Sequence, residues 1–258
     1  MKKNAFALIS ALMLLSLSSF AQEAANEDQR SFTTSLELSD YGVSTSYLWR
    51  GQTLSGLNLQ ADLSFNYEKG DFSAGLGTWF IHSFQEEIFG PFMANGYQEW
   101  DLYANAAYKG LSLTLTDYMS APYFNSSTYY GGDHALDATL EYYISANVPL
   151  TLSWSTIFLE KHPINLMANL DYNYYSSWFE ADFDFSFGNF PVDFTGSLGL
   201  VPWTSPYIDD VKGAHLAWLG LSAGYEIPIT SKYSLPTSLT LGVNPTDATF
   251  LWSFAIGF

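Results

Sequence analysis

The side chains of this chain that could do chemistry are mainly carboxylates, placed at every second position of alternating segments. The sharpest group is Glu180, Asp182 and Asp184, which puts three carboxylates on one face of an extended strand. Other carboxylates share the polar phase of their own segments: Asp62, Glu99, Asp101, Asp137, Glu141 and Asp193. Rings of Asp and Glu concentrate cations in a pore. The pattern predicts an acidic, cation-preferring pore lining, with simple solubility or the binding of divalent ions as the alternatives.

Arg50 is the only Lys or Arg that falls in the core of a predicted strand, which we expect to run from 33 to 51. Its phase points it to the same side as the carboxylates. One interpretation is a constriction element, a fixed cation that shapes the electric field where solute passes. The other is a structural ion pair that fills the interior and offsets part of the acidic repulsion. Both interpretations stay open at this point.

A catalytic role has little support in the sequence. Known twelve-stranded membrane hydrolases use Ser and His, and no Ser here stands in a recognisable nucleophile setting. The four histidines are His82, His134, His162 and His215, three of them at loops or strand ends. Acidic loop segments such as Asp209-Asp210 lack the spacing of a calcium loop. We expect no enzymatic activity, no metal site and no cofactor.

The carboxylates need strands to position them, and the clearest strand runs from 57 to 67. Apolar residues occupy its odd positions and polar residues its even ones, which is the pattern of a half-buried strand. The same alternation recurs along the chain and predicts twelve strands: 33–51, 57–67, 72–82, 99–108, 111–118, 135–144, 150–159, 178–187, 191–201, 214–225, 233–243 and 249–258.

Two segments depart from this simple pattern. The first strand changes phase around Asp40-Tyr41-Gly42, where a β-bulge would restore one continuous apolar face. The segment 166–174 also alternates, but in the opposite phase to the strand that follows it. It is either a thirteenth strand or an extension of the eighth, and the even count of bacterial barrels favours twelve.

Connection lengths point to an outer-membrane barrel. From the second strand onward they alternate between short and long, beginning with 68–71, 83–98, 109–110 and 119–134. Outer-membrane barrels pair tight periplasmic turns with longer extracellular loops. The chain is 48% hydrophobic and 18% aromatic, yet after the N-terminus no segment approaches a helical membrane span. We therefore predict an all-β fold, a transmembrane antiparallel up-and-down β-barrel of about twelve strands.

The cost of charge in lipid then assigns the two faces of the wall. A Lys or Arg that faces lipid at mid-depth costs about 2–4 kcal/mol, so the charged side chains should face the lumen. The surplus of aromatic residues should supply the interfacial girdles. Candidates for those girdles are Trp79, Trp100, Trp154, Tyr108 and Tyr225.

The N-terminus reads as a secretory signal. Lys2 and Lys3 precede an apolar run, and Ser19-Phe20-Ala21 is a typical cleavage pattern, so we expect a signal peptide over 1–21 and a barrel over 22–258. Without Cys the chain is no lipoprotein and forms no disulfide. Losing two lysines takes the formal net charge from −17 to −19, which argues against nucleic acid as a partner.

The last predicted strand carries large apolar residues at its even positions and ends at Phe258. Such a strand suits the membrane interface and recognition by the barrel-assembly machinery. The expected surroundings and partners are therefore outer-membrane lipid, that machinery and small solutes, with the bacterial outer membrane as the location.

The segment Ser46–Ser55, with the sequence SYLWRGQTLS, resembles the opening of the TorF-like family of outer-membrane porins, in which a "Y-x-[WF]-R-G" ending of the first strand is typical. The likeness extends to Thr116-Asp117-Tyr118 and to Val243-Asn244-Pro245, and it is closest to the Bacteroidetes-type branch. The resemblance implies a porin barrel.

These observations favour a porin-like channel for small or cationic solutes through an acidic lumen. A closed structural or adhesive barrel without transport is the alternative, because alternation alone does not determine whether side chains fill the lumen. A membrane-embedded hydrolase is the least favoured of the three.

Overall fold

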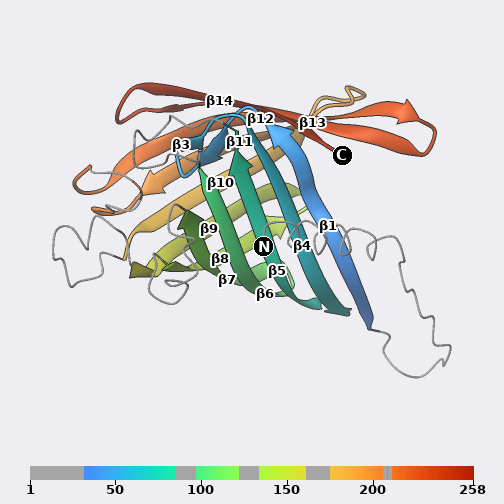
Figure 1. The fold of residues 1–258 in the computed structure, drawn as a ribbon, viewed down its shortest axis with the longest axis horizontal. Coiled ribbons are helices and arrows are strands. Elements are labelled where there is room, and N and C mark those ends of the chain that lie inside the picture. The colour runs from blue at the N-terminus through green and yellow to red at the C-terminus, as the bar shows by residue number, and fades with distance from the viewer. Residues whose placement is uncertain (1–31, 85–96, 122–133, 161–174, 206–207, 209–210) are drawn as a thin grey trace, which may run out of the picture.

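The computed structural model describes residues 32–84, 97–121, 134–160, 175–205, 208 and 211–258. Twelve strands form one closed antiparallel barrel in which chain neighbours pair side by side, and the first strand closes onto the last (Figure 1). The predicted all-β, up-and-down barrel of about twelve strands is confirmed. The described residues contain no helix that is long and apolar enough to cross a membrane.

The barrel strands differ little from the predicted ranges except at the start of the chain. They are β1 (Thr33–Ser44), β4 (Asn58–Lys69), β5 (Phe72–Ser83), β6 (Gln98–Tyr108), β7 (Leu111–Ala121), β8 (His134–Ser145), β9 (Val148–Glu160), β10 (Ser177–Ser186), β11 (Asp193–Val201), β12 (His215–Thr230), β13 (Tyr233–Asn244) and β14 (Thr249–Gly257). A separate two-stranded sheet consists of β2 (Tyr47–Trp49) and β3 (Gln52–Ser55).

The two faces of the wall follow the period-two alternation of each strand. In β7, Leu111, Leu113 and Leu115 are exposed on the outward face, and the polar residues between them face inward. The outward face is an apolar belt around the barrel. Its exposed residues include Leu36, Phe65, Leu76, Leu140, Leu221, Leu241 and Phe250.

Four of the five aromatic residues predicted for the girdles lie on that outward face: Trp100, Trp154, Tyr108 and Tyr225. The prediction for Trp79 is wrong. Trp79 is in register with Asp62 and Asp101 on the inner phase, and its ring centroid lies 5.2 Å from that of Tyr47 inside the barrel.

The predicted β-bulge in the first strand is confirmed. The register of β1 against β4 shifts between Ser39 and Gly42, and the extra residue keeps apolar side chains outward on both sides of the shift. Leu38 pairs with Leu63 before it and Val43 with Leu59 after it. The segment 166–174 lies outside the described residues.

The predicted end of the first strand at residue 51 is wrong. β1 ends at Ser44, and the chain then turns into the hairpin of β2 and β3. Arg50 (φ 47°) and Gly51 (φ 77°) form its tip, and positive φ at both central residues is the requirement of a tight type I′ turn. A Cβ at position 51 would lie 2.2 Å from the carbonyl oxygen of Ala217, so only glycine fits there.

The hydrophobic core lies inside the barrel, near the end at which β1 finishes and the longer connections emerge, which we call the loop end. Its buried residues are Trp178, Val201, Ile208, Ala217, Trp218 and Leu251. Glycines on neighbouring strands make room for the indole rings. A Cβ at Gly199 would lie 2.1 Å from the ring of Trp178, and one at Gly242 would lie 2.2 Å from the ring of Trp218.

Candidate functional site in the barrel interior

The hairpin of β2 and β3 folds into the barrel and packs on this core. We call residues Tyr47–Ser55 the inner hairpin. Leu48 and Trp49 pack against the buried cluster. The ring of Trp49 also meets that of Tyr118 edge-on, with 6.0 Å between the centroids. The apolar face of the inner hairpin is therefore buried inside the lumen, where it contributes to stability.

Arg50 crosses the lumen to β8. Its Nη2 lies 2.6 Å from Oδ2 of Asp137, and the two side chains are only 7% and 1% exposed. Thr139 donates a hydrogen bond to Oδ1 of the same carboxylate, at 3.0 Å. The guanidinium also lies 4.5 Å from the centroid of the Trp49 ring, within cation–π range. Arg50 thus sits at the tip of a turn, contrary to the prediction of a strand position, and fastens that turn to the opposite wall.

Polar contacts hold the rest of the inner hairpin. The amide of Asn244 donates to the carbonyl of Gly51 at 3.2 Å. At the base of the hairpin, the amide of Asn58 donates to the carbonyl of Gly56 at 2.7 Å. Just before the hairpin, the hydroxyl of Ser253 donates to the carbonyl of Ser46 at 2.6 Å. The inner hairpin and the residues that flank it are therefore tied to β4, β8, β13 and β14.

Four of the predicted carboxylates lie buried near the loop end: Asp62, Glu99, Asp101 and Asp137. Asp62 accepts hydrogen bonds from Ser39 at 3.1 Å and Tyr103 at 2.9 Å. Glu99 accepts a short hydrogen bond from the hydroxyl of Tyr97. Protein groups therefore hold Asp62, Glu99 and Asp137 in the interior network.

The other five predicted carboxylates lie closer to the short turns. Glu180 and Asp182 are half-buried, whereas Glu141, Asp184 and Asp193 are exposed. Glu141 and Glu180 are in register with Ser153 from its two sides, so the structure brings them into one row across β8, β9 and β10. Glu180 accepts a hydrogen bond from the indole of Trp178 at 2.5 Å, and Asp184 accepts one from Thr195 at 2.6 Å.

A cavity of about 720 Å³ occupies the lumen beside the inner hairpin. Side chains of the hairpin form one boundary, and hydroxyl-bearing residues from most of the surrounding strands form the rest. Its lining includes Arg50, Tyr118, Ser153, Ser155, Glu180, Asp182, Thr195, Ser197, Ser222 and Thr240. The lining carries the carboxyl groups of Glu180 and Asp182, and in their ionised form these groups would favour a small cation.

The two tryptophans of the buried core cluster, Trp178 and Trp218, are not among the predicted site residues. The indole of Trp218 donates to the hydroxyl of Ser197 at 2.8 Å. The alternation of the sequence could have indicated the inward position of Trp218. Trp218 shares the inner phase of its strand with Gly220, whose missing side chain leaves room for the indole ring.

The structure brings together few groups that could do catalysis. Nδ1 of His134 lies 2.9 Å from Oδ1 of Asp117, and Nδ1 of His215 lies 2.9 Å from the carbonyl of Gly213. His162 lies outside the described residues. Across the ranges that the structure describes, no three His, Cys, Asp or Glu residues are grouped so that they could hold a metal ion.

Comparison with models of known protein families, with characterised proteins and with solved structures gives no match for this chain. The resemblance to TorF-like porins therefore stays a prediction from the motif around Arg50.

Proposed function

We propose that this chain is an outer-membrane β-barrel protein, a porin-like channel in which small or cationic solutes pass through an acidic lumen narrowed by the inner hairpin. The observation that carries the proposal is the polar cavity of about 720 Å³ beside that hairpin. Its lining combines hydroxyl groups with the carboxylates of Glu180 and Asp182. The proposal assigns the chain no catalytic role.

The membrane location is supported by the two faces of the wall. Soluble monomers rarely expose contiguous apolar patches of more than a few hundred Å², yet Leu36, Leu76 and Phe250 are each at least 60% exposed on the outward belt. The barrel strands, at 9 to 16 residues, are long enough to span a bilayer, which takes about 9–11 residues per tilted strand. A signal peptide over 1–21, recognition by the assembly machinery and the TorF-like resemblance belong to the same proposal.

A closed structural barrel is the second candidate, and a specific observation favours it. The inner hairpin is held by a buried ion pair, by Leu48 and Trp49 in the core and by hydrogen bonds to several strands. A hairpin fixed in this way could block the lumen permanently. The two candidates differ in whether solute passes the hairpin, which conductance measures directly.

The test is conductance of the refolded protein in planar bilayers under a salt gradient. A channel should give ohmic steps and a reversal potential shifted toward cation selectivity, because carboxylates line the path. Replacing Glu180→Gln, Asp182→Asn and Asp184→Asn together should reduce that shift, while the control Asp71→Asn, in an exposed turn outside the cavity, should not. If the wild-type protein shows no conductance, the closed barrel is supported. If the reversal potential of the triple variant is the same as that of the wild type, these three residues are not the source of the cation selectivity.

A further inference from the structure

The seam between the first and last strands is the shortest in the barrel. β1 and β14 share three register pairs, Gly42 with Gly257, Val43 with Ile256 and Ser44 with Ala255. Every other neighbouring pair of barrel strands shares seven or more. Beyond the three pairs, the backbone amide of Phe258 donates to the carbonyl of Tyr41 at 2.9 Å.

Below the bulge, β1 is paired on one edge only. Thr33–Ser39 pair with β4, and among the described residues no strand pairs with their other edge. Figure 1 shows β1 continuing well past the end of β14. Leu36 is in register with Phe65 and Leu38 with Leu63, so this edge lies on the rows of the outward apolar belt. A strand edge at that depth in a membrane is costly, because hydrocarbon offers backbone groups no hydrogen bonds.

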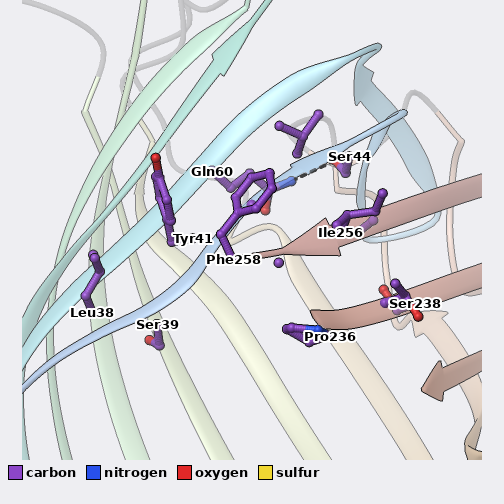
Figure 2. Close-up of a pocket in the computed structure, with 14 residues that line it drawn as sticks. Leu38, Ser39, Tyr41, Ser44, Gln60, Pro236, Ser238, Ile256 and Phe258 are labelled. Carbon is purple, nitrogen blue, oxygen red and sulfur yellow. Dashed lines mark hydrogen bonds between the residues drawn. The ribbon is translucent and has the colours of Figure 1, made fainter. Parts of the chain in front are cut away.

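A cavity of about 420 Å³ lies at this seam (Figure 2). Residues from both faces of the wall line it. Leu38, Val43 and Ile256 belong to the outward phase. Ser39 and Gln60 belong to the inward phase. Because an intact sheet would separate these two sets, the wall is perforated at the seam.

The seam cavity adjoins the lumen cavity. Ser44, Gln60 and Ala255 line both of them. Within the described part of the chain, every side chain that lines the seam cavity is uncharged. At its inner end the amide of Gln60 donates to the hydroxyl of Ser44 at 3.0 Å. The opening therefore passes from an apolar mouth to an inner end that offers hydroxyl and amide groups.

We propose that this seam is a lateral binding site for a single-chain amphiphile with an uncharged or zwitterionic head. The acyl chain lies against Leu38, Val43 and Ile256 and covers the free edge of β1, while the head reaches Ser44 and Gln60. The volume of about 420 Å³ falls within the range of about 300–1,000 Å³ that is usual for small-molecule sites. The inference rests on the membrane location proposed above but not on conduction.

The test uses photocrosslinking in phosphatidylcholine vesicles that contain the refolded protein. The probe is a lysophosphatidylcholine with a diazirine on the acyl carbons next to its head, and adducts are mapped by mass spectrometry. We expect adducts on the inward residues Ser44 and Gln60 in addition to those on the outward face. Adducts on the outward face alone overturn the seam site and leave the membrane location standing. If the protein carries no adducts on the outward face, both the seam site and the membrane location are overturned.

A blocking experiment separates the seam from general access to the lumen. Because the chain contains no Cys, Ser238→Cys can be modified after folding with a bulky maleimide at a position that lines the seam cavity. The matched control is Thr114→Cys on the inward phase of β7, which lies outside that cavity. Blocking position 238 should remove the inward adducts, and blocking position 114 should retain them. Equal effects overturn the proposal, as do crosslinks between two chains at β1, which would show a strand of a second copy on that edge.

Discussion

Breaking the ion pair between Arg50 and Asp137 should release the inner hairpin. The variant Arg50→Met keeps most of the side-chain volume but removes the guanidinium from a carboxylate that is 1% exposed. Losing one partner of a buried pair costs about 3–5 kcal/mol, because the remaining charge stays desolvated. Thr139 still donates to Asp137, but its hydroxyl carries no charge to replace that of the guanidinium.

Urea unfolding of the refolded protein in vesicles measures this cost. With a loss of about 4 kcal/mol and a denaturant slope of about 2 kcal/mol per molar, the unfolding midpoint should fall by about 2 M. The matched control is Lys109→Met, which removes an exposed pair with Asp71 (3.7 Å). Such surface pairs contribute about 0–1 kcal/mol, so the midpoint of the control should barely move.

A third variant tests whether the loss comes from the uncompensated charge. Arg50→Met combined with Asp137→Leu replaces the whole pair by apolar side chains, which in buried sites is often neutral or stabilising. The double variant should therefore recover most of the stability lost in the single variant. If Arg50→Met lowers the unfolding midpoint no more than Lys109→Met does, the buried ion pair does not hold the inner hairpin in place. Under the channel proposal, the single variant should also raise the conductance, since the hairpin is no longer fastened.

Two further substitutions test the interior packing and the assignment of faces. Gly242→Val should lower the unfolding midpoint, because the added side chain meets the ring of Trp218 and overpacking costs about 1–3 kcal/mol. The control Gly224→Val should be tolerated, because an added Cβ there meets only a carbonyl oxygen at 4.0 Å. Equal losses of stability in the two variants would contradict the packing argument. Leu115→Arg should cost about 2–4 kcal/mol in vesicles if its outward position faces lipid at mid-depth. Thr114→Arg, on the inner phase of the same strand, should cost clearly less, and the reverse order in vesicle unfolding would invert the assigned faces.

Alternation predicts the wall of this barrel well because it is a local property of each strand. In β7 the side of every residue follows from its parity, and in β1 the change of parity near Tyr41 is enough to locate the bulge. The same rule placed nine carboxylates on the inner phase. At Trp79 parity outweighs residue type, since its phase matches that of the inward Gly75 and Gly77.

The inner hairpin escaped prediction because local pattern and long-range contacts disagree there. Val43, Tyr47 and Trp49 continue a strand-like alternation, and nothing near them in sequence specifies an inward fold. What holds the hairpin is Asp137 together with Trp178, Trp218 and other residues that come much later in the chain. Only Gly51 gave a local hint of a turn, and Arg at the preceding position is uncommon in a left-handed conformation.

The placement of the inner hairpin also bears on the order of assembly. The hairpin follows β1 directly in the sequence. The residues that hold it and its flanks in place nevertheless include Asn244, Leu251 and Ser253 from the last two strands. Contacts between such distant parts of a chain form slowly, because a long loop must close first. We therefore expect the inner hairpin to reach its final position late, when β1 pairs with β14 and the barrel closes.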